Sequence, residues 1–279
     1  MDAPIRFTKA SGAGNDFVVI DATRGASLPG YAALARAACD RHAGVGADGL
    51  IVLEAEPSAD FRMRYYNADG SHGGMCGNGG RCAARFAHDN GIAGPSQRFV
   101  ALDYVYEAEV AVHGVRLRMK PAARFRRGVR VQAAGETFEV CFIDTGSPHV
   151  VVFVEDLDRV NVTGWGRPLR NAPAFAPEGA NVNFVSVHGP DAIAMRTYER
   201  GVEAETLACG TGAIASAVVS SILHGIRPPV RVHARSGETL TVEFRRTGDA
   251  AEDVALSGSA VLLFTGEFRY DEAAGRIHA

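Results

Sequence analysis

The pentapeptide CGNGG at Cys76–Gly80 returns as CGTGA at Cys209–Ala213, 133 positions further along a chain of 279 residues. Three other blocks also recur in the same order, at offsets of 132 or 133 positions. They are GNDFVVID from Gly14 and GSPHVVVF from Gly146, GADGLIVLEAE from Gly46 and GANVNFVSVHG from Gly179, and MRYYN from Met63 and MRTYE from Met195. Four blocks matched at a nearly constant offset indicate that the chain consists of two homologous halves.

Each half shows the same succession of elements. Short β-rich runs come first, then the cysteine–glycine turn, and then a helical pattern. The runs are DFVVID, GLIVLEA and FRMRYY in the first half, and HVVVFVED, VNFVSVH and AMRTYE in the second. Gly91 and Gly225 are placed to end the two helices. We therefore predict an α+β fold with two pseudo-symmetric halves, each an antiparallel β-barrel-like sheet around a central helix.

The halves are expected to cover residues 1–122 and 123–266. The linker between them is predicted near KPAARFRRG, at 120–128. The helical pattern of the second half, TGAIASAVVSSILHG, is more apolar than that of the first, so we expect that helix to be buried inside its half.

Composition excludes several classes of protein. Apolar residues make up 47% of the chain and charged residues 22%, which fits a folded protein with ample core material. The net charge of -3 argues against nucleic-acid binding, which needs a clustered basic face. No apolar run is long enough to span a membrane, and the N-terminus lacks the apolar core of a signal peptide. Five scattered cysteines do not suggest a disulfide scaffold, so a reducing cytoplasm is expected.

The repeated turn favours reactive thiols. A cysteine that directly precedes a Gly-x-Gly turn at the start of a helix lies beside main-chain N–H groups that the helix does not use. These donors and the helix dipole favour a thiolate, by up to about 2 kcal/mol or roughly 1.5 pKa units, against an ordinary thiol pKa near 8.5. The same N–H groups can hold a substrate carboxylate and stabilise charge that develops on it.

Other interpretations of the turn fit less well. Zinc ligands usually come as C-x2-C pairs, whereas Cys76 and Cys82 are separated by five residues, and His72 and His88 would join them only at irregular spacing. The same spacing does not suit a redox pair. A phosphate loop would need a following GK[ST] sequence. We therefore predict no metal and no cofactor, with Cys82, Cys39 and Cys141 as small apolar core residues.

Cys76 and Cys209 occupy equivalent positions in the two halves. A pseudo-twofold axis would direct both helix N-termini, and both thiols, toward one cleft. Two like bases that face each other across one carbon suit the removal of an α-proton from one face and its return to the other. This pattern predicts racemisation or epimerisation without pyridoxal phosphate, with electrostatic preorganisation lowering the barrier to proton abstraction.

The sequence resembles the diaminopimelate epimerase family over nearly its whole length. The matching motifs are KASGAGNDFVVID, CDRHAGVGADGL, YYNADGSHGGMCGNGGRCAARF, GSPHVVVFVED, GANVNFV and TYERGVEAETLACGTGA. The resemblance implies pyridoxal-phosphate-independent conversion of LL-diaminopimelate to the meso form, in lysine and peptidoglycan precursor synthesis. It also implies two similar barrel-like halves, with a C-terminal strand within 267–279 that returns to the first half.

By resemblance, Cys76 and Cys209 are the two catalytic acid/bases, and His149 and Glu199 tune them. The remaining positions that match substrate-binding residues of the family are Asn15, Asn67, Gly77, Asn78, Asn181, Glu199, Arg200, Gly210 and Thr211. At offset 132, His149 corresponds to Phe17 and Glu199 to Asn67, so the titratable pair belongs to the second half alone. The expected partner is a small-molecule substrate, with no nucleic acid and no membrane; the oligomeric state is left open, a homodimer included.

The chain departs from the family pattern at three places. Ser147 stands where many members have a substrate-contacting asparagine, and Gly49 where some have a glutamine ligand. The segment from Glu199 to Cys209 is one residue longer than usual. Two alternatives stay open: a racemase of the same fold, such as proline racemase, and a binding protein or isomerase of the fold without thiol chemistry. Asn78 and the Glu199–Arg200 pair favour the acyclic diamino diacid.

Overall fold

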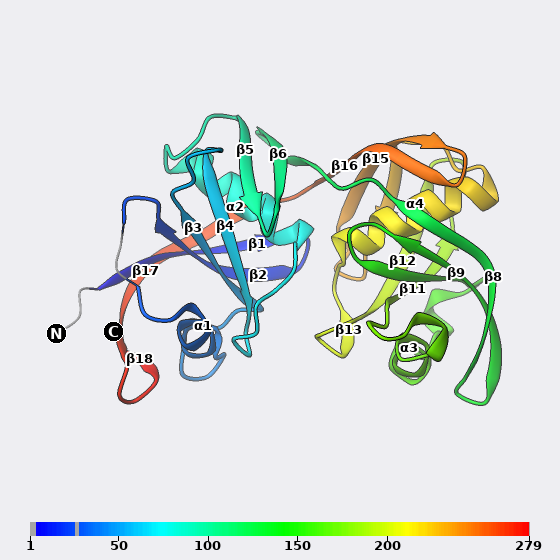
Figure 1. The fold of residues 1–279 in the computed structure, drawn as a ribbon, viewed down its shortest axis with the longest axis horizontal. Coiled ribbons are helices and arrows are strands. Elements are labelled where there is room, and N and C mark those ends of the chain that lie inside the picture. The colour runs from blue at the N-terminus through cyan, green and yellow to red at the C-terminus, as the bar shows by residue number, and fades with distance from the viewer. Residues whose placement is uncertain (1–3, 26–27, 279) are drawn as a thin grey trace. The chain divides into compact units, whose positions relative to one another are not determined.

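The computed structural model describes residues 4–25 and 28–278, and the chain divides into two compact units. One unit comprises residues up to Leu117 together with those from Gly258 onward, and the other comprises Arg118–Ser257. The sequence prediction placed the corresponding boundaries at 122/123 and 266/267. Residues 1–3, 26–27 and 279, which the predicted first half includes, lie outside the described residues. In Figure 1 the first unit runs from blue to cyan, with the C-terminal strands in red.

In its described residues the first unit has two helices and a set of short strands. Its elements are β1 (Ile5–Gly12), β2 (Asn15–Ala22), α1 (Tyr31–Cys39), β3 (Gly49–Glu54), β4 (Phe61–Asn67), α2 (Gly77–Asp89), β5 (Ser96–Ala101), β6 (Tyr104–Ala111), β7 (Gly114–Arg118), β17 (Val261–Asp271) and β18 (Arg276–His278).

The second unit repeats this plan. Its elements are β8 (Ala123–Ala133), β9 (Glu136–Asp144), β10 (Pro148–Phe153), η1 (Leu157–Arg159), α3 (Val162–Arg170), η2 (Pro173–Phe175), β11 (Asn181–Val187), β12 (Ala192–Glu199), β13 (Ala204–Thr206), α4 (Gly210–His224), β14 (Val230–His233), β15 (Thr239–Thr247) and β16 (Ala250–Gly258).

Strand directions follow from the connections. Consecutive strands joined by short turns, such as β1–β2 and β3–β4, are antiparallel. Strands separated by a helix are parallel: β2 and β3 enclose α1, and β4 and β5 enclose α2. The second unit does the same, with β10 and β11 around α3 and β12 and β14 around α4. A parallel pair requires a crossover, which the helix supplies. The sheets are thus mixed, where the sequence prediction described them as antiparallel.

Both predicted central helices are present, and each is largely buried. Helix α2 buries its first eight residues, while α4 buries nearly its whole length because it is apolar on almost every side. Helix α4 ends at Gly225, whose φ of 69° lies in the left-handed region that favours glycine. The outer helices α1 and α3 each cover a separate apolar cluster against the strands of their own unit.

The predicted fold class is confirmed: two similar halves, each a sheet with a central helix. One local prediction is wrong, because most of the expected linker at 120–128 forms the first part of β8. Its arginines lie along an exposed strand that pairs with β9, so the basic run covers a sheet surface and does not bridge two domains. No helix among the described residues has the length and apolar character needed to cross a membrane.

Candidate active site

Each of the two predicted catalytic cysteines caps the N-terminus of its central helix. Cys76 is the N-cap of α2, and its Sγ accepts a hydrogen bond from the Gly79 backbone N at 3.3 Å. Cys209 is the N-cap of α4, and its Sγ accepts from the Gly212 N at 3.4 Å. Both cysteines have extended backbone conformations, as an N-cap requires. Each half therefore places one sulfur at the positive end of a helix dipole.

The residues that follow each cysteine form the first turn of its helix. Backbone N–H groups in this turn are not used by the helix itself, so those of Gly77 and Gly210 are suited to hold an anion. In the second half, the Thr211 hydroxyl lies 3.6 Å from Cys209 Sγ. Each turn can thus bind a carboxylate beside its thiol, as the sequence prediction proposed for these positions.

In the first half, polar side chains gather around Asn78 at the start of α2. Asn78 Nδ2 donates to Asn15 Oδ1 at 2.6 Å, so these two predicted site residues are in contact. Arg81 is fully buried, and its guanidinium donates to Asn78 Oδ1 at 2.9 Å and to the carbonyls of Gly77 and Ser259 at 3.2 Å each. Arg81 therefore orients Asn78 from within the core.

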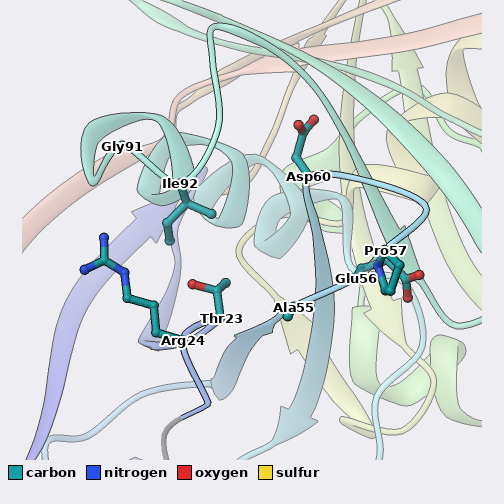
Figure 2. A pocket seen from close by; sticks show the side chains of 8 residues that line it. All are labelled: Thr23, Arg24, Ala55, Glu56, Pro57, Asp60, Gly91 and Ile92. Carbon is teal, nitrogen blue, oxygen red and sulfur yellow. The ribbon is translucent and has the colours of Figure 1, made fainter.

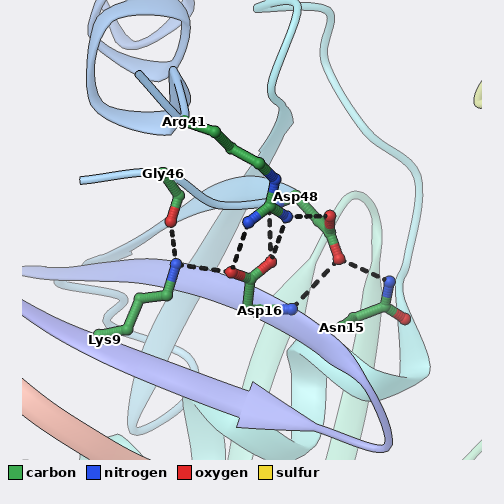
Figure 3. Close-up of polar contacts among 6 residues, drawn as sticks. All are labelled: Lys9, Asn15, Asp16, Arg41, Gly46 and Asp48. Atoms are coloured by element: carbon green, nitrogen blue, oxygen red, sulfur yellow. Dashed lines mark hydrogen bonds and ion pairs between the residues drawn. The ribbon is translucent and has the colours of Figure 1, made fainter. Parts of the chain in front are cut away.

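Asn15 is in turn held by an ionic network on the other side (Figure 3). Asp48 Oδ2 accepts from Asn15 Nδ2 at 3.0 Å, and Arg41 bridges Asp48 and Asp16 at 2.7 Å and 2.8 Å. Lys9, which is buried, lies 2.7 Å from Asp16 and also donates to the Gly46 carbonyl. The network leaves the Asn15 amide one orientation, with Oδ1 directed to Asn78.

The network also determines the charge of Asp16. Burial alone would raise the pKa of this carboxyl, but hydrogen bonds from Arg41 and Lys9 outweigh burial and lower the pKa from 3.8 to about 2. Asp16 is therefore ionised at all pH values at which an enzyme normally works.

In the second half, an asparagine in β11 packs against the first turn of α4. Asn183 is fully buried, and its Oδ1 lies 2.3 Å from the point that a Cβ on Gly212 would occupy. Its Nδ2 donates to the Val150 carbonyl at 3.0 Å and lies 3.1 Å from His149 Nδ1. Thr197 donates to Asn183 Oδ1 at 3.0 Å. These contacts connect His149 with the first turn of α4.

His149 is uncharged in this environment. The side chain has no exposed surface, and burial, assisted by the positive charge of Arg200, lowers its pKa from 6.5 to about 3. Among the residues that the structure describes, none makes a hydrogen bond with His149 Nε2. His149 is therefore a neutral ring in which Nε2 has no hydrogen-bond partner among the described residues.

Asn181, at the start of β11, connects the start of β10 with the end of β12. Its Oδ1 accepts from the Arg200 backbone N at 2.9 Å, and its Nδ2 lies 3.2 Å from both Ser147 Oγ and the Pro148 carbonyl. Ser147, one of the departures from the family pattern, is thus part of the same cluster. The Arg200 guanidinium donates to the Glu178 carbonyl at 3.4 Å, which is a weak contact that leaves the group adaptable.

Two further predicted residues lie at strand ends. Glu199 ends β12 and accepts from the Thr206 hydroxyl at 2.7 Å. Asn67 ends β4, and its amide donates to Ser71 Oγ at 2.9 Å. Glu199 and Asn67 are equivalent in the repeat, so each half has one polar side chain at the end of the equivalent strand.

The other three cysteines are core residues. Cys39, Cys82 and Cys141 are all buried. Burial raises the pKa of Cys39 and of Cys82 to about 12, and it also raises the pKa of Cys141. These thiols therefore stay protonated and unreactive at neutral pH. Within the described ranges no group of three or more His, Cys, Asp or Glu side chains is arranged to hold a metal ion.

Gly49 cannot carry a longer side chain in this protein. A Cβ there would lie 2.5 Å from Tyr65 Cε2, and a Cβ on Gly73 would lie 2.2 Å from Tyr65 Cδ1. The Tyr65 ring thus fills the space beside both glycines and packs edge-on against Phe17, with 6.0 Å between ring centroids. No side chain at Gly49 can serve as a substrate ligand.

An open pocket of about 440 Å³ lies elsewhere on the first unit (Figure 2). The residues that line it lie in the segments that follow β2, β3 and α2, and none is among the predicted site residues. Arg24, Glu56 and Asp60 give it both signs of charge without converging on one point in Figure 2. It has none of the features of the cysteine-capped helix starts.

A sequence profile described as diaminopimelate epimerase matches residues 7–110 and 141–263. The chain belongs to the diaminopimelate epimerase family. The diaminopimelate epimerase of Chlorobaculum tepidum is 47% identical over 260 residues, which cover 92% of this chain and 98% of the relative. That of Aquifex aeolicus is 45% identical over 278 residues, covering 94% and 97%. The resemblance inferred from the motifs is confirmed.

Solved structures share the fold of the diaminopimelate epimerase family at low sequence identity. A phenazine biosynthesis protein of the PhzF family from Bacillus anthracis superposes with a TM-score of 0.73 at 14% identity, over 95% of this chain and 99% of the other. A hydroxyproline epimerase from Agrobacterium vitis, with bound trans-4-hydroxy-L-proline, also gives 0.73 at 14% identity, over 98% and 94%. These similarities concern the fold alone.

Sequence reasoning on this diaminopimelate epimerase family member missed four polar residues that hold the predicted ones in place. They are Asp48 and Arg81 in the first half and Asn183 and Thr197 in the second. One signal was available for Asn183, since it lies two residues from Asn181 in a mostly apolar strand and therefore points to the same face. Arg81 carried no signal, because an arginine in a helix is usually exposed.

Proposed function

We propose that this protein is an isomerase that converts LL-diaminopimelate to meso-diaminopimelate by a two-cysteine acid/base mechanism without pyridoxal phosphate. One thiolate removes the α-proton, and the other thiol donates a proton to the opposite face of the same carbon. The observation that carries the proposal is the repetition of one device, a cysteine sulfur at the N-cap of a buried helix, in both halves. Membership of the diaminopimelate epimerase family supports the substrate.

The roles divide among the residues of each half. Cys76 and Cys209 exchange protons with the α-carbon, while the first helical turns bind the reacting carboxylate. The positions assigned to this carboxylate are Gly77, Asn78, Gly210 and Thr211. Glu199 and His149 tune the thiols, and the rest of the substrate is held by Asn15, Asn67, Asn181, Glu199 and Arg200. The Arg200 guanidinium suits the distal carboxylate because its planar fork of donors matches a planar acceptor.

Proton transfer in heavy water tests the mechanism. A cysteine thiol exchanges its proton with solvent, so the hydrogen delivered to the product is deuterium if two opposed thiols act. We expect product formed early in the reaction to carry α-deuterium while recovered substrate stays largely protiated. The reaction is run on LL-diaminopimelate without added cofactor and followed by mass spectrometry of the separated isomers. Return of the original proton to product would contradict the two-base assignment.

Substrate choice tests the identity of the substrate separately. A substrate that lacks the distal carboxylate leaves the Arg200 fork without its acceptor, so we expect a loss of about 2–4 kcal/mol in transition-state stabilisation. Turnover of L-lysine or L-proline at the rate of LL-diaminopimelate would exclude the assignment and favour the racemase alternative.

We also propose a reducing cytoplasmic location, because both catalytic thiols must stay reduced and their substrate belongs to amino-acid and peptidoglycan precursor metabolism.

A homodimer remains a prediction, which sedimentation at several protein concentrations tests. Mild oxidation tests the thiols: activity is expected to fall in air and return with a thiol reductant.

A further inference from the structure

The orientation of the Asn183 side chain is determined by its neighbours. Nδ2 lies 3.0 Å from the Val150 carbonyl, which can only accept, so the NH₂ group of the amide must point there. Exchanging the positions of oxygen and nitrogen would set two acceptors against each other. The Thr197 hydroxyl, 3.0 Å from Oδ1, completes the arrangement as a donor.

The second hydrogen of the Asn183 NH₂ group is directed at His149. The distance from Nδ2 to His149 Nδ1 is 3.1 Å, and a group that only donates requires an acceptor there. Nδ1 must therefore carry a lone pair and no proton. Because burial keeps the ring neutral, the single ring proton resides on Nε2.

We propose that Asn183 is a positioning residue that holds His149 as the neutral tautomer with the proton on Nε2, so that His149 acts as a hydrogen-bond donor and not as a base. Nε2 is buried and makes no hydrogen bond with any described residue. A buried N–H without a partner costs free energy, so it is ready for an anionic acceptor that becomes available during the reaction. Both a thiolate and a substrate carboxylate have this chemistry.

Asn183 also links this tautomer to the cysteine. The point that a Gly212 Cβ would occupy lies 2.3 Å from Asn183 Oδ1 and 3.2 Å from Cys209 Sγ, so the two groups are close neighbours across the first turn of α4. The Asn183 amide therefore has one end against the turn that holds the sulfur and the other against the ring that donates. The contribution to turnover rests on the proposed epimerase function; the tautomer does not.

Nitrogen-15 NMR of the imidazole tests the proposal without reference to activity. The two ring nitrogens of a neutral histidine have distinct shifts according to which carries the proton, and the His149 signals are assigned by their loss in His149→Phe. In the wild-type protein at pH 7 we expect a protonated Nε2 and an unprotonated Nδ1. A wild-type ring with its proton on Nδ1, or one protonated on both nitrogens, would overturn the proposal.

Two variants extend the test. In Asn183→Asp both side-chain oxygens accept, so we expect the His149 ring to place a proton on Nδ1, with kcat lowered about 10- to 100-fold and KM changed little. Thr197→Ser keeps the hydroxyl and is the matched control for the hydrogen bond, so the tautomer of His149 should stay that of the wild-type protein. An unchanged His149 tautomer in folded Asn183→Asp would refute the role of Asn183.

The two kinds of failure are distinguishable. If the wild-type protein shows the expected tautomer but does not epimerise LL-diaminopimelate, the proposed function is wrong while the assignment of His149 stands. If it epimerises the substrate with a proton on Nδ1, the function stands and this inference fails. Should Asn183→Asp not fold, the wild-type spectrum still decides, because it needs no substitution at Asn183.

To identify the acceptor of the His149 Nε2 proton, the spectrum of Cys209→Ala is recorded with and without LL-diaminopimelate. A shift of the Nε2 proton signal on adding substrate identifies the carboxylate as acceptor. A shift that is present in the wild-type protein across the thiol titration, and absent in Cys209→Ala, identifies the thiolate. A proton signal that responds to neither would overturn the donor role.

Discussion

Beneath the first turn of each central helix, the two halves place different side chains at equivalent strand positions. In the second half these are His149, Asn183 and Thr197, joined by hydrogen bonds; in the first half they are Phe17, Ile51 and Tyr65. The strand registers establish the equivalence, since Ile51 pairs with Tyr65 as Asn183 pairs with Thr197. Gly79 accordingly faces the Ile51 methyl, whereas Gly212 faces the Asn183 oxygen.

The first half has its polar support around Asn78. Arg81 lies one turn into α2 and holds Asn78, while the equivalent residue of α4 is the apolar Ile214. The ionic network of Lys9, Asp16, Arg41 and Asp48 supports the same asparagine through Asn15. One backbone plan thus carries two different polar environments. A repeat preserves the helix N-terminus that both thiols need, and leaves each half free to tune its own thiol.

The largest expected effect concerns the thiols themselves. Cys76→Ala and Cys209→Ala should each reduce epimerisation by at least about a thousandfold, and the double variant should be little worse than either, because the pair acts as a unit. Rates of isomer interconversion measure this, with Cys141→Ala as a control for loss of a core thiol. Substantial epimerisation by one of the two single variants would show that the halves are not both required.

Arg81 tests the polar support of the first half. Arg81→Met removes donors from the Gly77 carbonyl, Asn78 and the Ser259 carbonyl, so we expect the free energy of unfolding to fall by about 3 kcal/mol or more. The matched change in α4, Ile214→Val, should cost about 1 kcal/mol. Urea denaturation measures both. Equal losses in the two variants would mean that the buried arginine has no specific role.

Substitutions of the glycines in the first helical turns test the side chains that pack beneath those turns. Gly212→Ala places a methyl against the buried Asn183 oxygen, and we expect a loss of about 2–3 kcal/mol in stability together with reduced kcat. Gly79→Ala meets the flexible end of Ile51 at 3.2 Å. Its helix propensity gain offsets that contact, so stability should stay within about 1 kcal/mol of the wild-type value. Thermal or urea unfolding that ranks the two variants in the reverse order would contradict the comparison.

The pH dependence of the unfolding free energy tests a further difference between the halves, since only the second has a histidine at this position. His149 binds a proton near pH 6.5 in the unfolded chain but only near pH 3 when folded. Protonation therefore favours unfolding, and the unfolding free energy should fall as pH falls through this range, with a slope approaching about 1.4 kcal/mol per pH unit from this group. His149→Phe installs the residue of the first half and should remove that slope, although the variant is less stable at neutral pH. Parallel pH profiles of the two proteins would refute the burial of a neutral ring.

Asp16 is expected to change the unfolding free energy by less than His149 does, and at lower pH. Its folded pKa of about 2 lies below the ordinary 3.8, so the network stabilises the protein above about pH 4 and loses this contribution as pH falls toward 2. The contribution is at most about 2 kcal/mol. Asp16→Asn should flatten the unfolding free energy between pH 4 and pH 2 relative to the wild-type protein. A profile unchanged in that interval would show that Asp16 gains nothing from Arg41 and Lys9.

Local pattern was sufficient for the secondary structure near the site. The β-rich run DFVVID and the apolar run TGAIASAVVSSILHG predicted β2 and α4, because residue preferences and end signals are properties of neighbouring residues. The pattern failed at 120–128, where an arginine-rich run forms the exposed strand β8. Charged residues are common in both linkers and exposed strands, so only pairing with β9 decided between them.

The sequence by itself determined the two halves, the central helices, the family and the two cysteines, because all of these are written in a repeat and in short motifs. Only the tertiary structure decided what surrounds each thiol. Asn183 meets His149 across two parallel strands 34 positions apart, and Arg81 reaches Ser259 across 178 positions. Hydrogen bonds between such distant residues depend on strand register and on burial, which no local pattern specifies. The similarity of the halves was therefore visible in the sequence, and their chemical difference emerged only when the chain was folded.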